Sequence, residues 1–434
     1  MKSAGGTFLF LLGGAINSLA ATAPPTGCDI CAREKEEYCS IWPTSPLCAT
    51  LCGFVFDVES GLCWEEGTPQ EHRIVGRTAV APIVGGSGKF RYQYMPQLLQ
   101  KPAGAAFTNC HGLSVDKDEN IILTYQNDGK TDTQCLATWN PDGTGGTLSG
   151  DPTLCSGTPH GLKITTEGDE QFLYHANNAQ KLAKTTLNGS VVWLKDGLFG
   201  QNETCGPDMC PNNSCSCKNG QAPYIPTWFA TPPNSKYMYL CDGYGSDHVY
   251  AFESATGTFM NKTFGGRSPA GLHPGVAGAR AAPHGKFMEN HGCTWDPRPT
   301  TSPNTIVVSD RRNMRFEFFH YDPNTPDKFD WYQTKDMSPD AQLGPNTLPC
   351  NMRMTHGSKF DPSKDGRSVV ADLYGPVAVL DSAHEVLSVV NVSVLLAAEQ
   401  HKHPHDAIFL KNGDIVVGTW APGRISYWKR LPVE

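Results

Sequence analysis

Short runs of alternating apolar and polar residues recur from about residue 105 to the end of the chain. Each group opens with a His-Gly or related turn, which is followed by an apolar run. A second apolar run then follows after Asp, Asn or Gly. Alternation over about four to eight residues between turn residues predicts β-strands. Six such units, roughly fifty to sixty-five residues apart, start at Cys110, Pro159, Pro226, Asn290, Thr355 and Pro404.

The sixfold recurrence predicts the fold, because one unit of three or four strands cannot bury both faces of its sheet. Six units arranged radially can bury them, and closing the ring protects the strand edges. We therefore expect an all-β, six-bladed β-propeller over residues 71–434. A β-sandwich or several small β domains is the alternative, although neither requires one turn signature to recur six times.

The first residues predict export. Thr7–Ile16 is a short apolar run after Lys2, and Ser18-Leu19-Ala20 fits the small-x-small cleavage rule, so residues 1–20 are expected to be a signal peptide. An N-terminal membrane anchor is the alternative, but the run is too short to span a bilayer stably. The mature chain is therefore expected to have no membrane span.

A separate cysteine-rich segment is expected at residues 21–70. An even number of cysteines after a signal peptide predicts disulfides, and the chain contains 16. A zinc module is the alternative, because Cys28-x-x-Cys31 and Cys48-x-x-x-Cys52 have ligand-like spacing. The segment's cysteines, which predict three disulfides, are Cys28, Cys31, Cys39, Cys48, Cys52 and Cys63.

Glycosylation sequons agree with a secreted or secretory-lumen location. The net charge is −8 and no long basic or acidic run occurs. Neither nucleic acid nor an anionic membrane is therefore an expected partner. We expect a monomer that takes a small molecule or peptide into its central channel. The sequons begin at Asn188, Asn202, Asn212, Asn261 and Asn391.

Histidines stand at the openings of five of the six units. The innermost strand of each propeller blade lines the central channel, so these side chains are expected to converge. Neutral imidazole is the commonest metal ligand, and three imidazoles can hold zinc with one position open. A structural role at each turn is the alternative. The five histidines are His111, His160, His291, His356 and His405.

Two further residues end strands of the third and fourth units. Tyr244 follows Asp242-Gly243, and Arg311 follows Asp310. A tyrosine can act as a general base when a nearby cation lowers its pKa, and an arginine can orient a carboxylate or stabilise an oxyanion. Ordinary β-turn chemistry is the alternative for both.

Together these motifs resemble the peptidyl-α-hydroxyglycine α-amidating lyase family, within the NHL-type propellers. The resemblance covers roughly residues 105–430 and is distant. It rests on Pro159-His160-Gly161-Leu162, the His291-Gly292 unit, Pro404-His405-Asp406, Cys241-Asp242-Gly243-Tyr244 and Ser309-Asp310-Arg311-Arg312-Asn313.

The resemblance implies roles for several residues. Zinc would be bound by His160, His291 and His405 of alternating units, and calcium by Asp406 and the backbone of Leu162. Tyr244 and Arg311 would be the catalytic pair. The implied reaction cleaves a C–N bond and gives a peptide amide and glyoxylate.

The chain also departs from the family pattern. His403 replaces a methionine two residues before the last zinc histidine, and His284 competes with His291 in the fourth unit. His111 and His356 are additional, so the metal could be coordinated differently.

A metal-dependent lyase is the first functional hypothesis. A non-catalytic propeller that binds a protein, peptide or glycan is the second, and another propeller enzyme, such as a polysaccharide lyase or a lactone or ester hydrolase, is the third.

Overall fold

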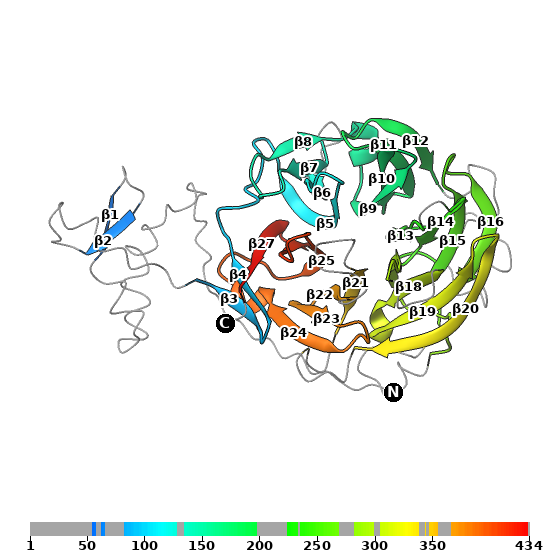
Figure 1. Cartoon of the computed structure of the whole chain (residues 1–434). Helices are drawn as coiled ribbons and strands as arrows, with labels where there is room; N and C mark the ends of the chain where they lie inside the picture. The colour runs from blue at the N-terminus through cyan, green and yellow to red at the C-terminus, as the bar shows by residue number, and fades with distance from the viewer. Residues whose placement is uncertain are drawn as a thin grey trace, which may run out of the picture. The chain divides into compact units, whose positions relative to one another are not determined.

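Six antiparallel sheets follow one another around a common centre, with the first strand of each sheet innermost (Figure 1). The all-β six-bladed propeller predicted from the repeats is therefore confirmed. The computed structural model describes residues 54–57, 62–65, 82–127, 134–197, 224–232, 235–268, 282–298, 304–337, 343, 347–354 and 366–432.

Each of the first five blades has four strands that pair in chain order. Blade 1 consists of β5 (Phe107–Val115), β6 (Ile121–Asn127), β7 (Leu136–Trp139) and β8 (Thr147–Ser149). Blade 2 consists of β9 (Pro159–Glu167), β10 (Glu170–Asn177), β11 (Lys181–Thr186) and β12 (Val191–Asp196). Blade 3 consists of β13 (Trp228–Ala230), β14 (Tyr237–Cys241), β15 (His248–Glu253) and β16 (Phe259–Gly265).

The next two blades follow the same order. Blade 4 consists of β17 (Asn290–Trp295), β18 (Thr305–Asp310), β19 (Arg315–Asp322) and β20 (Thr325–Asp336). Blade 5 consists of β21 (Pro349–Met354), β22 (Ser368–Asp372), β23 (Pro376–Leu380) and β24 (Val386–Asn391). Short helical turns, α3 (Pro152–Cys155), η5 (Arg311–Asn313) and α5 (Val392–Leu395), lie between strands.

The sixth blade joins the two ends of the propeller. Its inner strands are β25 (Pro404–Phe409), β26 (Ile415–Thr419) and β27 (Arg424–Arg430), and its outer strands are β4 (Phe90–Tyr94) and β3 (Val84–Ser87). Trp428 pairs with Tyr94 in this sheet, so residues more than 330 positions apart share one ladder. This pairing leaves no open edge at which the ring could separate.

The hydrophobic core is divided among the spaces between blades. Each buried apolar cluster contains residues of two neighbouring blades, such as Leu162 with Ile122, or Trp228 with Ile306. The same is true around the whole ring. Burying these faces is what holds the blades together, since area removed from water is the main source of stability.

The fifth blade differs from the sequence-based expectation. We expected its inner strand to follow His356, but that strand is β21, which ends at Met354. The run from Pro349 to Met354 is buried throughout, yet it lacks the His-Gly pair that opens blades 1, 2 and 4, with Cys350-Asn351 in its place. His356 is not equivalent to the other histidines, and it lies outside the described residues.

The chain divides into two units between Ala81 and Pro82. In the first, β1 (Phe54–Asp57) and β2 (Leu62–Glu65) form an antiparallel pair. The signal peptide and most of the predicted cysteine pairs lie outside the described residues. A disulfide joins Cys135 to Cys155 within the propeller. Among the described residues, no helix is long and apolar enough to cross a membrane.

A β-bulge marks the second residue of most inner strands. In β17, Asn290 pairs with Asp310 and Gly292 with Ser309, so His291 has no opposite residue. Similar register shifts occur at His111, His160, Cys350 and His405. A bulge re-aims the side chain of its extra residue, and here the bulge turns it from the sheet face toward the channel.

Glycine follows three of these histidines because the next blade passes very close. A Cβ at Gly161 would lie 2.5 Å from the carbonyl oxygen of Thr227, and one at Gly292 would lie 2.7 Å from that of Cys350. The same two carbonyls accept hydrogen bonds from the Nδ1 atoms of His160 and His291, at 2.8 Å and 3.0 Å. The His-Gly pair therefore fixes the spacing between inner strands.

We predict that Gly161→Ala destabilises the propeller, since the clash is with backbone that cannot rotate away. Overpacking of this kind costs about 1–3 kcal/mol, which urea denaturation would report as a lower midpoint. Gly418→Ala in β26 is the control, because a Cβ there meets its nearest neighbours at an ordinary 3.7 Å. Equal stability of the two variants would contradict the close-approach argument.

Candidate metal centre

Four histidines from four blades meet at the start of the inner strands. The ring centroids of His160 and His405 are 4.6 Å apart. His111 lies 4.6 Å and 4.7 Å from these two rings, and His291 lies 4.9 Å and 4.7 Å from them. His160, His291 and His405, which the sequence analysis assigned to zinc, are therefore neighbours, and His111 joins them.

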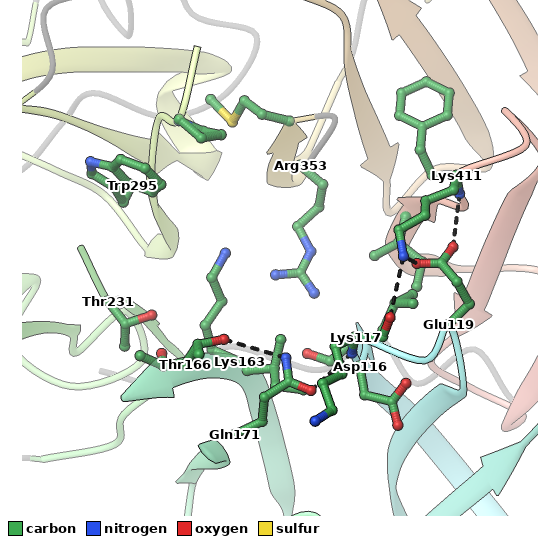
Figure 2. Close-up of a pocket in the computed structure, with 18 residues that line it drawn as sticks. Asp116, Lys117, Glu119, Lys163, Thr166, Gln171, Thr231, Trp295, Arg353 and Lys411 are labelled. Atoms are coloured by element: carbon green, nitrogen blue, oxygen red, sulfur yellow. Dashed lines mark hydrogen bonds and ion pairs between the residues drawn. The ribbon is translucent and has the colours of Figure 1, made fainter. Parts of the chain in front are cut away.

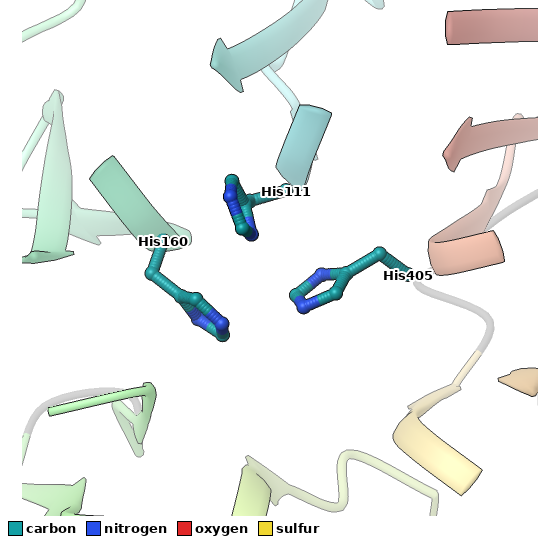
Figure 3. Close-up of side chains that lie close together, drawn as sticks. All are labelled: His111, His160 and His405. Atoms are coloured by element: carbon teal, nitrogen blue, oxygen red, sulfur yellow. The ribbon is translucent and has the colours of Figure 1, made fainter. Parts of the chain in front are cut away.

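The tightest group of ligand atoms belongs to His111, His160 and His405. One nitrogen from each lies within 4.8 Å of the others, and Figure 3 shows the three rings directed toward one space. His291 is outside this closest group, although its ring contacts those of His160 and His405 as the ring of His111 does. The cluster is thus a four-membered group with two central and two outer imidazoles.

Among the described residues, most ring nitrogens of this cluster have no hydrogen-bond partner. Both ring nitrogens of His111 and His405, and the Nε2 atoms of His160 and His291, are buried without a hydrogen bond. Buried polar atoms are normally paired, and each exception requires an explanation. The Nδ1 atoms of His160 and His291 donate to backbone carbonyls. Each Nε2 atom therefore carries a lone pair that can bind a metal, as in metal-binding histidines.

Burial keeps these imidazoles neutral. It lowers the pKa of His160 to about 3 and holds the pKa values of His111, His291 and His405 well below the usual range. Mutual repulsion among the rings, if they were charged, adds to the effect on the last three. Neutral imidazole is the form that binds a metal, so the residues present fit a zinc ion.

A tyrosine and an arginine lie beside this cluster. The ring of Tyr244 is 5.4 Å from that of His160 and 5.5 Å from that of His291. The guanidinium of Arg311, which begins η5, donates to the Tyr244 hydroxyl at 3.2 Å. Burial raises the pKa of Tyr244, and the Arg311 charge opposes that rise. The structure thus brings both expected residues to the histidines.

Glu289 completes this group and was missed by the sequence analysis. Its carboxylate accepts from Arg311 at 2.6 Å and also pairs with Arg312. Glu289 has a positive φ of 58° and lies just before β17. No turn residue occurs at that position in the sequence. The only feature that could have identified Glu289 as a site residue was its place immediately before Asn290-His291.

Two other residues occupy ring positions without being histidines. Thr227 and Cys350 stand at the second position of the inner runs of blades 3 and 5, where the other blades have histidine. Their carbonyls hold His160 and His291. The spacing of Cys350 from the neighbouring units could have identified it as a ring position. The His356-Gly357 pair was taken instead as the opening of this unit.

Two of the additional histidine candidates do not join the cluster. His284 stacks on Trp331 at 3.6 Å and pairs with Glu317, with 46% of its side chain exposed. The Nδ1 atom of His403 donates to the carbonyl of Leu373 at 2.9 Å. Neither belongs to the group of closely spaced ligand atoms.

At the expected calcium site, one oxygen of Asp406 has other partners, while its Oδ1 atom is buried without one among the described residues. The carboxylate of Asp406 accepts from the backbone of Leu113 at 2.9 Å and faces the guanidinium of Arg353 at 3.1 Å. Lys163 follows Leu162 and its charge acts on the same carboxylate. Calcium is bound by oxygen ligands, usually several carboxylates, so two cations around a single carboxylate do not fit it.

Comparison with known proteins adds similarity at the level of the fold. No family model and no curated protein matches the chain. A gluconolactonase from Xanthomonas campestris aligns with a TM-score of 0.47 and 12% identity, over 79% of this chain and 90% of its own. An inactive variant of Staphylococcus aureus virginiamycin B lyase, solved with quinupristin, aligns with a TM-score of 0.44 and 11% identity, over 79% and 100%.

We predict a pH signature for the metal-free protein. Below the ordinary histidine pKa of about 6.5 the unfolded chain binds a proton at residue 160, while the folded chain does not until pH about 3. His160 therefore makes acidification destabilising, by about 1.4 kcal/mol per pH unit across that window.

The measurement is the difference in urea unfolding free energy between the metal-free wild type and His160→Gln, at pH 7.5 and 5.5. A difference is needed because Asp242 and Asp310, whose pKa values burial raises to about 7, take up protons over the same range. The wild type should lose stability relative to the variant at the lower pH. A difference that is independent of pH would contradict a neutral, buried His160.

Proposed function

We propose that this protein is a secreted, zinc-dependent propeller lyase that cleaves a C–N bond in a peptide ending in α-hydroxyglycine. The observation that supports this most strongly is the cluster of buried, unpartnered imidazole nitrogens beside the Tyr244–Arg311 pair. The cluster supplies metal ligands, and the pair supplies a proton acceptor with its own cation.

Zinc would be held by His160 and His405 together with His111, whose ligand atoms form the closest group. His291 offers a fourth nitrogen. The proposed ligand set therefore differs by one residue from the set that the family resemblance implies, because His111 takes the place of His291. A bound zinc supplies Lewis acidity that polarises a substrate oxygen.

Tyr244 is the proposed base. In its deprotonated, tyrosinate form its oxygen takes the proton of the substrate hydroxyl, the C–N bond breaks, and the carbinol carbon becomes the aldehyde carbon of glyoxylate. The same proton then passes to the departing nitrogen, which leaves as the peptide amide. Arg311 stabilises the tyrosinate through its hydrogen bond, and Glu289 holds the guanidinium in place.

Secretion and glycosylation are part of the same proposal. The described sequon asparagines, Asn188, Asn261 and Asn391, are all exposed, as glycan attachment requires. The disulfide between Cys135 and Cys155 suits an oxidising compartment. Asn202 and Asn212 lie outside the described residues.

We predict about one zinc per chain in purified protein by elemental analysis. His160→Ala and His405→Ala should each abolish it, because these rings are central to the cluster. His111→Ala should weaken zinc binding more than His291→Ala, since only the former belongs to the closest group of nitrogens. His284→Ala is the control and should keep the metal. Zinc-free wild type would favour the non-catalytic binding propeller instead.

We predict that Tyr244→Phe lowers the rate of glyoxylate release from an α-hydroxyglycine peptide by about 10²-fold or more, while zinc content stays unchanged. Tyr321→Phe, in β19, is the matched control and should keep wild-type turnover. Arg311→Met should also lower turnover, with part of the loss recovered at higher pH, because the cation that opposes the rise in the Tyr244 pKa is gone. Full turnover by Tyr244→Phe would show that the base lies elsewhere.

A further inference from the structure

A cavity lies toward the ends of the inner strands that are opposite to the histidine cluster. It has a volume of about 490 Å³, and residues from all six blades line it. Val115, Trp295, Met354 and Phe409 are the last residues of β5, β17, β21 and β25. His160, His291 and His405 are instead the second residues of β9, β17 and β25. We call this cavity the basal pocket.

Two buried cations reach into the basal pocket. Lys163 in β9 is 9% exposed and Arg353 in β21 is 6% exposed, and each is the fifth residue of its strand. Figure 2 shows the ammonium and the guanidinium directed into the same space. Positive side chains are almost never buried unless they are paired, so their partners decide what the pocket can bind.

One carboxylate faces both cations. Asp406 pairs with Arg353 at 3.1 Å, and Arg353 also donates to the carbonyl of Leu113. The Arg353 Nε atom is buried without a partner. Among the described residues, the Lys163 ammonium has neither a hydrogen bond nor an ion pair of its own. The charged form of Lys163 is therefore uncompensated inside the protein, and a buried cation without an anion is costly.

The other acidic groups of the basal pocket have partners of their own. Glu119 pairs with Lys411 at 2.6 Å. Asp116 accepts from the backbone of Asp118 and Asn120 at 2.9 Å and 2.8 Å. Lys117 adds a further cation at the rim. The pocket is therefore positive, although the chain as a whole carries a net charge of −8.

Most of the remaining wall is apolar, although Ser114, Thr165, Thr166, Gln171 and Thr231 also line the pocket. The apolar part is formed by Val115, Ile164, Trp295, Met354, Ile408 and Phe409. A cavity of this size, with apolar walls and a few convergent polar groups, is typical of a small-molecule site. An inorganic anion would leave those walls in contact with water, whereas an organic anion would cover them.

We propose that the basal pocket binds an organic carboxylate, whose carboxylate group pairs with Lys163 and Arg353 and whose apolar body lies against Trp295, Met354 and Phe409. The site is independent of the proposed lyase centre. Burial and the neighbouring Arg353 charge lower the pKa of Lys163 to about 7, and a bound carboxylate would favour its charged form.

The test is calorimetric titration of the full, zinc-loaded protein with sodium octanoate, octanamide and octylammonium. Octanoate should bind at least about tenfold more tightly than octanamide, a difference of about 1.4 kcal/mol, and octylammonium should not bind. Equal affinity for octanoate and octanamide, or no octanoate binding, would overturn the proposal.

Lys163→Met tests the site itself. The substitution should weaken octanoate binding at least about tenfold without loss of fold, because it leaves no carboxylate newly unpaired. Lys262→Met, a distant surface variant in β16, is the control and should bind as the wild type does. Zinc content is measured on the same samples and should be unchanged. Wild-type octanoate affinity in a folded Lys163→Met would overturn the assignment, whereas loss of zinc alone would affect only the lyase proposal.

Discussion

The close contact between neighbouring inner strands is the constraint on which the rest of this structure depends. At Gly161 and Gly292 the backbone of one blade touches the backbone of the next, with no room for a Cβ atom. The contact lets a carbonyl of the next blade orient the preceding histidine. Closure through the Trp428–Tyr94 pairing keeps all six inner strands around one axis. Without that closure, the histidines would have no common point.

The two ends of the channel differ in charge. At one end, burial holds four imidazoles neutral, so that their lone pairs are available to a metal. At the other, Asp406 pairs with Arg353, and the ammonium of Lys163 lies nearby without an ion pair of its own among the described residues. Asp406 follows His405 in β25, so one strand contributes a residue to each end.

The surroundings of Asp406 show how neighbouring residues decide what a channel carboxylate can bind. Asp406 follows His405 in β25, and the partners of its Oδ2 atom are a guanidinium and a backbone amide. Side-chain cations can neutralise a buried carboxylate as an ion would, and they do so without a metal. Fold similarity alone therefore says little about which groups bind in the channel.

The sequence by itself determined the propeller and most of the ring. The sixfold recurrence of alternating runs requires radial packing, and the His-Gly pairs identified His111, His160 and His291 because bulge and glycine together leave a local trace. Tyr244 and Arg311 were also predicted, since both follow strands that end at the channel. These features depend on residues close together in the chain.

Only the tertiary structure decided the remaining features. The inner strand of blade 5 was misplaced because Cys350-Asn351 carries no such trace, and His356-Gly357 mimics one. Glu289, and the meeting of Lys163 with Arg353, join residues of different blades, and nothing in the local pattern of either residue refers to the other. Their proximity is set by the curvature and closure of the ring, which short-range periodicity does not encode.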